Sequence, residues 1–202
     1  MTPTAGSAGR RTAAAALCAM ALAGCTAPVR LSRSDLMRDE SSDDTVDGGL
    51  PPAPRPDAAP IAILPVEDRR PDPNSLGEVG NRSFGSSELK GWVDEQLAAV
   101  ASPDFVVVKG PAPRPPRLTV RPRILKAYVG ALDVTKSAVI VIEVEFVPAG
   151  GASVSRVFRG QDASLNWGNG QGEVTRALQR ATAACLEQIR GDIEHRLRAG
   201  RA

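Results

Sequence analysis

Side chains that could perform acid–base chemistry are few and scattered in this sequence. Glu143 and Glu145 alternate with apolar residues, so both carboxylates point to one face of a predicted strand. Two carboxylates so placed could act as general acid and base, but alternation also puts polar residues on the solvent side of an ordinary strand. His195 is the only histidine, and no cysteine pair accompanies it to form a metal site or catalytic triad. We therefore expect no enzymatic activity, no metal and no other cofactor.

The N-terminus has the pattern of an export signal. Arg10 and Arg11 precede an apolar stretch over residues 12–23, and no acidic residue occurs before Asp35. A helix of this stretch reaches only about 18 Å, whereas a bilayer core is roughly 30 Å thick. The segment therefore targets the chain for export and does not span a membrane.

A thiol ends this stretch. Residues 22–25 read Leu-Ala-Gly-Cys, which resembles the lipobox of bacterial lipoproteins. The resemblance implies a signal peptide over residues 1–24, cleavage between Gly24 and Cys25, and covalent lipid on Cys25. Two or more acyl chains give a durable membrane anchor; a chance cysteine after an ordinary signal is the alternative. The residue after Cys25 is Thr26, whereas an Asp at this position resembles the inner-membrane retention signal of enteric-type lipoproteins. We therefore expect the protein to be anchored at the periplasmic face of the outer membrane.

Charge and composition divide the rest of the chain into two parts. The whole sequence has 25 basic and 23 acidic residues, but the mature chain is formally neutral once Arg10 and Arg11 leave with the signal, so we expect no nucleic-acid partner. Residues 25–58 are acidic and Pro-rich without hydrophobic periodicity, and we expect them to be a disordered tether. Residues 59–202 have the size of one domain.

Hydrophobic periodicity predicts the elements of this domain. The expected strands are Ile61–Val66, Phe105–Val108, Leu118–Ile124, Ser137–Val147 and Val154–Leu165, and the expected helices run from Ser86 or Ser87 to Val100 and from Glu173 to Leu197. The economical packing is an α+β fold, with a mainly antiparallel sheet of about five strands and two amphipathic helices on one face.

Asp68 and Arg70 follow the first predicted strand. The aspartate can accept turn amides, and the arginine presents a planar fork to a carboxylate or phosphate. Two interpretations stay open: a local ion pair that fixes the loop, or a contact for a partner or anion.

Arg117, Arg121 and Arg123 share one face of the Leu118–Ile124 strand, opposite its apolar positions. Pro122 cannot donate to a ladder of hydrogen bonds, which favours an edge strand open to a partner. The three arginines are either simply solvated or a surface for an envelope protein or an anionic envelope component.

The domain resembles the YajG family of bacterial lipoproteins over most of residues 59–195. The resemblance is carried by Asp68–Asp72 after the first strand, by Leu76–Val79, and by Ser86–Leu89 at the helix start. The chain departs from the family in its longer acidic tether and in a Pro-rich link before Leu118. The resemblance implies fold and location but no reaction.

These observations lead us to expect a membrane-anchored envelope lipoprotein with a non-enzymatic binding or scaffolding domain. An auxiliary subunit of an envelope transporter is one alternative, because such lipoproteins share a similar order of elements. A periplasmic hydrolase that uses Glu143 and Glu145 is another.

Overall fold

Three long antiparallel strands form the centre of the fold. The computed structural model describes residues 28–37, 53–108, 115–132, 135–164 and 170–200. In it β7 (Leu118–Leu132), β8 (Thr135–Pro148) and β9 (Val154–Ser164) pair in sequence order. The alternation predicted for β8 is confirmed, because Ile140, Ile142, Val144 and Phe146 are all fully buried.

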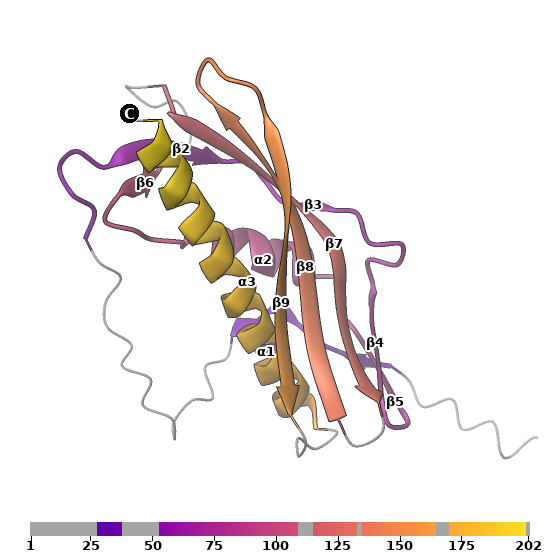
Figure 1. The fold of residues 1–202 in the computed structure, drawn as a ribbon. Coiled ribbons are helices and arrows are strands. Elements are labelled where there is room, and N and C mark those ends of the chain that lie inside the picture. The colour runs from indigo at the N-terminus through magenta and orange to yellow at the C-terminus, as the bar shows by residue number, and fades with distance from the viewer. Residues whose placement is uncertain (1–27, 38–52, 109–114, 133–134, 165–169, 201–202) are drawn as a thin grey trace, which may run out of the picture.

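Short strands complete the sheet on the other side of β7 (Figure 1). They are β1 (Val29–Arg30), β2 (Ala59–Ile63), β3 (Glu67–Asp68), β4 (Ser75–Val79), β5 (Arg82–Gly85) and β6 (Phe105–Val107). β2, β3 and β4 each run parallel to β7, and β6 runs parallel to β2. β5 is antiparallel to β4 and carries β1 as a parallel neighbour. The result is a mixed sheet of nine described strands.

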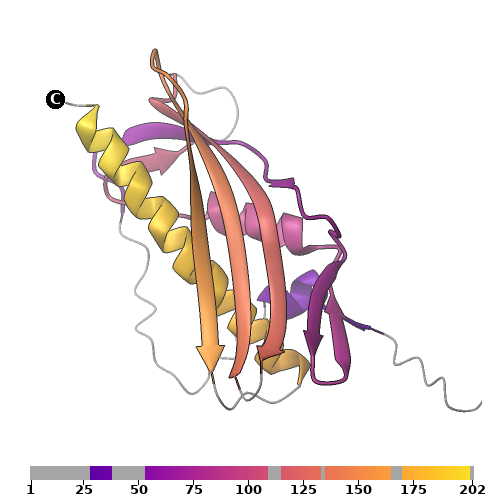
Figure 2. The ribbon, with the colours of Figure 1, turned by 45° about the vertical axis from the view of Figure 1, so that its right-hand side comes forward.

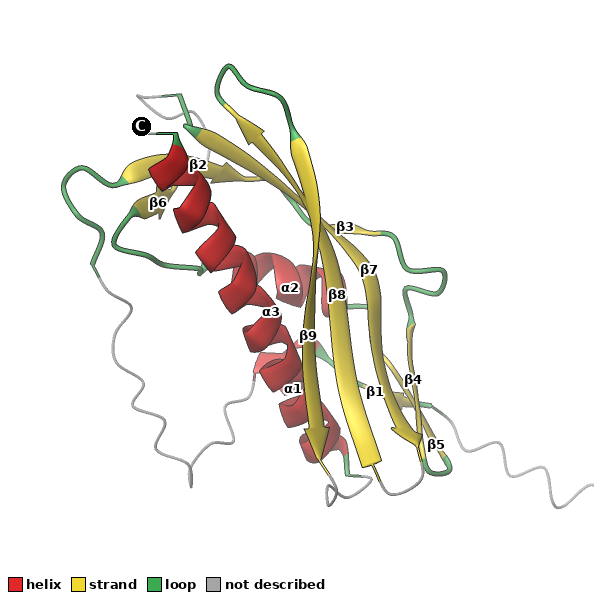
Figure 3. Cartoon of the chain, viewed as in Figure 1, coloured by secondary structure: helices red, strands yellow, loops and turns green. Residues whose placement is uncertain are grey.

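All three described helices cover one face of this sheet, as Figures 2 and 3 show. They are α1 (Arg33–Met37), α2 (Leu89–Ala98) and α3 (Gln171–Ala199). α3 lies close against β9, because a Cβ atom at Gly160 would come within 1.8 Å of the carbonyl oxygen of Ala181. None of the helices in the described ranges is long and apolar enough to cross a membrane.

The expected sheet of about five mainly antiparallel strands with two helices is therefore wrong. The missed strands are two to five residues long, too short for alternation to identify them, and their parallel partners are distant in sequence. β7 also runs eight residues past the predicted end at Ile124. A bulge between Ile124 and Lys126 shifts the alternation there, which hides the continuation of the strand.

The prediction that Pro122 marks an edge strand is also wrong, because β7 lies inside the sheet between β8 and the short parallel strands. The backbone carbonyls of Val120 and Ile124 both accept hydrogen bonds from the residues that follow β2 and β3. Because alternate residues of a strand direct their backbone groups to the same neighbouring strand, the backbone nitrogen of Pro122 also points to that side. It stands opposite the interruption between β2 and β3, where no ladder donor is needed. A proline is tolerated inside the sheet because the ladder is already broken there.

The expected tether contains a folded segment. Residues 28–37, predicted to be disordered, form β1 and α1, and Leu31 and Leu36 are 2 % and 1 % exposed. Gln179 donates to the carbonyl of Leu36 (2.8 Å), and Arg33 pairs with Glu95 on α2. Composition averaged over the whole acidic stretch hides two leucines that the domain core can bury. Residues 38–52 of the expected tether lie outside the described residues.

Candidate functional site

Asp68 and Arg70 form a largely buried ion pair at the loop that follows β3. The Arg70 side chain is 3 % exposed, and its Nε and Nη2 donate to Oδ1 and Oδ2 of Asp68 at 3.0 and 2.8 Å. The same guanidinium donates to the carbonyls of Ser75 (3.0 Å) and Pro73. Of the two interpretations drawn from the sequence, this geometry is that of a local ion pair that fixes the loop.

Arg121 and Arg123 lie on the sheet face that the helices leave uncovered. Arg123 is 3.3 Å from Glu143 and 3.1 Å from Glu145, and Arg121 is 3.6 Å from Glu145. The hydrogen bond to Glu143 raises the pKa of the Arg123 guanidinium. The two glutamates are thus bound in ion pairs with arginines, and each arginine already has a carboxylate partner.

Arg117, the third arginine of the predicted set, lies apart from the other two. It precedes β7 and reaches across to the end of α3, where its Nη2 donates to the carbonyl of Gly200 at 3.2 Å. Within the described residues, the partner of this side chain is a neutral carbonyl and not a carboxylate. Its charge is therefore available to an anion.

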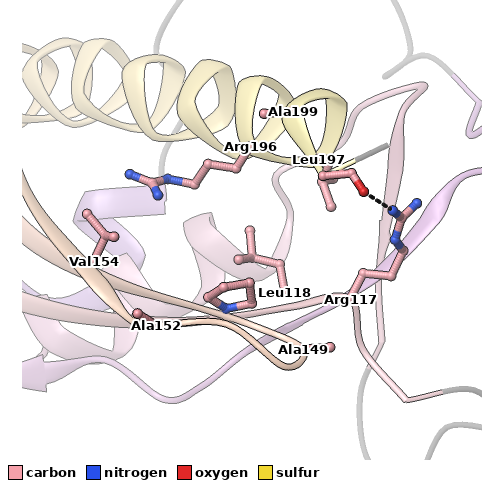
Figure 4. A pocket seen from close by; sticks show the side chains of 10 residues that line it. Arg117, Leu118, Ala149, Ala152, Val154, Arg196, Leu197 and Ala199 are labelled. Carbon is pink, nitrogen blue, oxygen red and sulfur yellow. Dashed lines mark hydrogen bonds between the residues drawn. The ribbon is translucent and has the colours of Figure 1, made fainter. Parts of the chain in front are cut away.

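Arg117 lines a cavity of about 410 Å³ beside the C-terminal end of α3 (Figure 4). The cavity lies between the β8–β9 turn and the last turn of α3, and its walls are mostly apolar. It is lined by Arg117, Leu118, Pro148, Ala149, Ala152, Val154, Arg196, Leu197, Ala199 and Gly200. Strand pairing of Leu118 with Pro148 fixes one wall, and burial of Leu197 fixes the helix end that forms the other.

A second arginine of the cavity, Arg196, is held in place by Asp192, which lies one turn earlier on α3. Its Nε donates to Oδ2 of Asp192 at 2.7 Å, and its guanidinium lies 4.3 Å from the centre of the Phe146 ring. Asp192 is 7 % exposed and also accepts from Arg156 of β9. Sequence reasoning missed Arg196 and Asp192, although their spacing of four residues on a helix is the signal of such a pair.

Apolar walls beside the guanidinium of Arg117, whose described partner is a neutral carbonyl, favour a particular kind of ligand. Apolar contacts would hold a hydrocarbon chain or an apolar peptide segment, and a guanidinium binds a carboxylate through charge-assisted hydrogen bonds. The arrangement therefore suits an apolar group that carries a carboxylate.

The remaining reactive side chains lie away from the cavity lining. His195 is exposed on α3, and Cys185 is fully buried, where desolvation raises the pKa of its thiol to about 11. In the part of the chain that the structure describes, no group of histidine, cysteine and acidic side chains is arranged to hold a metal ion. Gly24 and Cys25 lie outside the described residues.

Comparison with protein-family models and with curated proteins finds no match for this sequence. Among solved structures, a hypothetical protein from Chlamydia trachomatis is similar, with 13 % identity, a TM-score of 0.46, and coverage of 66 % of this chain and 96 % of that one. A Xanthomonas campestris protein of family DUF330 has 13 % identity, a TM-score of 0.45, and coverage of 72 % and 92 %. The lipoprotein GNA1162 from Neisseria meningitidis has 12 % identity, a TM-score of 0.37, and coverage of 66 % and 99 %.

Lipoproteins are thus among the structural neighbours of this chain. Identities and scores at this level assign neither a family nor a function. Membership of the YajG family stays a prediction.

Proposed function

We propose that this protein is a lipid-anchored, non-enzymatic binding protein of the bacterial envelope, whose partner inserts an apolar, carboxylate-bearing segment into the cavity beside Arg117. The observation that carries the binding role is an apolar cavity with an arginine whose described partner is a neutral carbonyl. The anchor rests on the sequence of residues 1–25.

The interactions of the glutamates support a non-enzymatic role over a hydrolase. Glu143 and Glu145 share the guanidinium of Arg123 on the sheet face that the helices leave uncovered. A general acid or base has to lie beside a bound substrate, and neither glutamate belongs to the lining of the cavity beside Arg117.

Energetic reasoning also favours an acidic partner. A hydrogen bond to a charged group contributes about 1.5–3 kcal/mol, and Arg117 gives up only one bond to a backbone carbonyl to make it. An envelope protein with an apolar segment and an acidic side chain or a C-terminal carboxylate satisfies both parts of the cavity.

The binding role is tested by photo-crosslinking in living cells. A photoreactive residue at Ala152, in the cavity lining, is expected to capture a defined species, whereas one at Ser155, exposed on β9 outside that lining, is not. The variant Arg117→Glu should abolish the capture because it opposes an acidic partner. Arg159→Glu is the matched control, since Arg159 is an exposed arginine of β9 outside the lining. Capture that persists in Arg117→Glu contradicts the proposal.

The anchor is tested separately by metabolic labelling with an acyl analogue. We expect the wild-type chain to carry the label and the variant Cys25→Ser to accumulate as an unlabelled precursor. A labelled Cys25→Ser chain would refute the assignment of the lipid to this residue.

A further inference from the structure

The direction of β1 shows toward which end of the domain the N-terminal residues run. Val29 and Arg30 pair in parallel with Phe84 and Gly85 of β5, and the amide of Leu31 donates to the carbonyl of Gly85 at 2.8 Å. Because the two strands are parallel, the chain before Val29 leads toward the start of β5, which is the tip of the β4–β5 hairpin. That tip carries Gly80 and the exposed Asn81.

Few residues separate this strand from the proposed lipid. Cys25 precedes Val29 by four positions, and four residues span at most about 14 Å even when fully extended. The lipid therefore has to lie close to the hairpin end of the sheet, whatever the conformation of the residues between them.

The segment after β1 is packed firmly against the domain, so the short link fixes the position of the lipid relative to the whole domain. Leu31 and Leu36 are buried in the core, and burial of a leucine contributes about 1.5–3 kcal/mol. Arg33 binds Glu95 of α2, and Gln179 of α3 binds the carbonyl of Leu36. The N-terminal segment is thus fastened to two helices as well as to the sheet.

The cavity lies at the opposite end of the same strands. β8 leads away from the hairpin end, where it follows β7, to Pro148 in the cavity wall, and α3 runs the same way to Gly200 (Figures 1 and 2). The 14 residues of β8 and the 29 residues of α3 correspond to lengths of about 46 Å and about 43 Å.

We propose that the domain stands end-on on the membrane, with the β4–β5 hairpin at the lipid headgroups and the cavity at the far end. The proposal rests on the lipid anchor proposed above. Arg30 is exposed on β1, and a cationic side chain there favours anionic headgroups. The cavity then faces a partner roughly 40 Å from the bilayer surface, a height set by the strand and helix lengths, and not a lipid of the anchoring leaflet.

Fluorescence quenching on the full lipidated chain tests this orientation. Single cysteines are introduced as Asn81→Cys at the hairpin tip and Ser153→Cys at the β8–β9 turn, both exposed positions. Cys185 is fully buried and its raised thiol pKa keeps it unreactive toward the label. The chain is placed in vesicles of phosphatidylethanolamine and phosphatidylglycerol that contain a lipid with a quencher on its headgroup.

We expect quenching to be several-fold greater at position 81 than at position 153. Equal quenching, or stronger quenching at position 153, would overturn the end-on orientation while leaving the anchor intact. Flotation of the vesicles separates the two proposals, because a lipidated chain that does not float with them contradicts the anchor itself. A chain that begins at Thr26, and so carries neither the signal nor Cys25, should show neither flotation nor quenching.

A linker insertion tests the cause of the orientation. A flexible Gly-Ser segment of about 20 residues between positions 27 and 28 adds a reach of about 25 Å, so the difference between the two labels should shrink strongly. A difference that survives the insertion would overturn the role of the short link.

Discussion

The sequence makes both Arg70 and Arg117 candidates for a contact with an anion or a partner, and the structure places them in opposite situations. Arg70 is buried, and its guanidinium is shared among a carboxylate and two backbone carbonyls of its own loop. Arg117 is exposed at the rim of a cavity and donates to one carbonyl. Residue type and strand position identify the arginines that could bind an anion. Whether a given arginine is available to do so depends on the hydrogen-bond acceptors that surround it in the fold.

The largest expected effect is that of removing the Arg70 side chain. Arg70→Ala leaves Asp68, with a side chain only 12 % exposed, without its charged partner, and breaking a buried ion pair costs about 3–5 kcal/mol. We expect a loss of this size in the free energy of unfolding, measured by urea denaturation. Arg69→Ala is the control, because Arg69 is exposed and pairs with Glu67 at the surface, and it should change stability by less than about 1 kcal/mol. Equal effects of the two variants would contradict a structural role for Arg70.

Arg70→Lys sharpens the same point with the charge retained. A lysine ammonium cannot present the planar fork that reaches both oxygens of Asp68 and two carbonyls at once. We expect the variant to recover the charge interaction but not these hydrogen bonds, and so to unfold at a urea concentration between those of wild type and Arg70→Ala. Full recovery with lysine would show that charge alone stabilises the loop.

Long-range periodicity explains which parts of this fold were predictable. β8, β9 and α3 each carry a regular pattern over more than ten residues, and their predicted positions agree with the structure. The segment 28–37 has only Leu31 and Leu36 to bury, and two apolar residues in a polar stretch give no period. Its order comes from surfaces on α2, α3 and β5 that the sequence does not show to be adjacent.

The candidate site follows the same rule. Arg117 could be selected from its strand alternation, but the cavity joins it to residues 148–154 and 196–200, which are distant in sequence. Alternation also grouped Arg117 with Arg121 and Arg123, although they have different partners, because it reports a shared face and not the neighbours across that face.

A smaller loss of stability is expected from a change at Asp192, which holds the arginine of the cavity wall. Asp192→Asn removes the charge that holds Arg156 and Arg196, while the amide oxygen can still accept one hydrogen bond. Loss of a largely buried charged acceptor costs about 1–3 kcal/mol, again measured by urea denaturation. The matched control is Glu187→Gln on an exposed position of the same helix, with an expected change within about 0.5 kcal/mol. Indistinguishable variants would show that Asp192 does not organise the cavity wall.

The smallest expected effect on stability belongs to Arg117→Ala, which should change the free energy of unfolding by less than about 0.5 kcal/mol because an exposed hydrogen bond is replaced by water. The same variant should nevertheless lose the species captured through Ala152, and Arg117→Lys should restore part of the capture because it keeps the charge. Arg70 would then stabilise without binding, and Arg117 would bind without stabilising. A variant Arg117→Ala that unfolds as easily as Arg70→Ala would erase this distinction, since both arginines would then be structural.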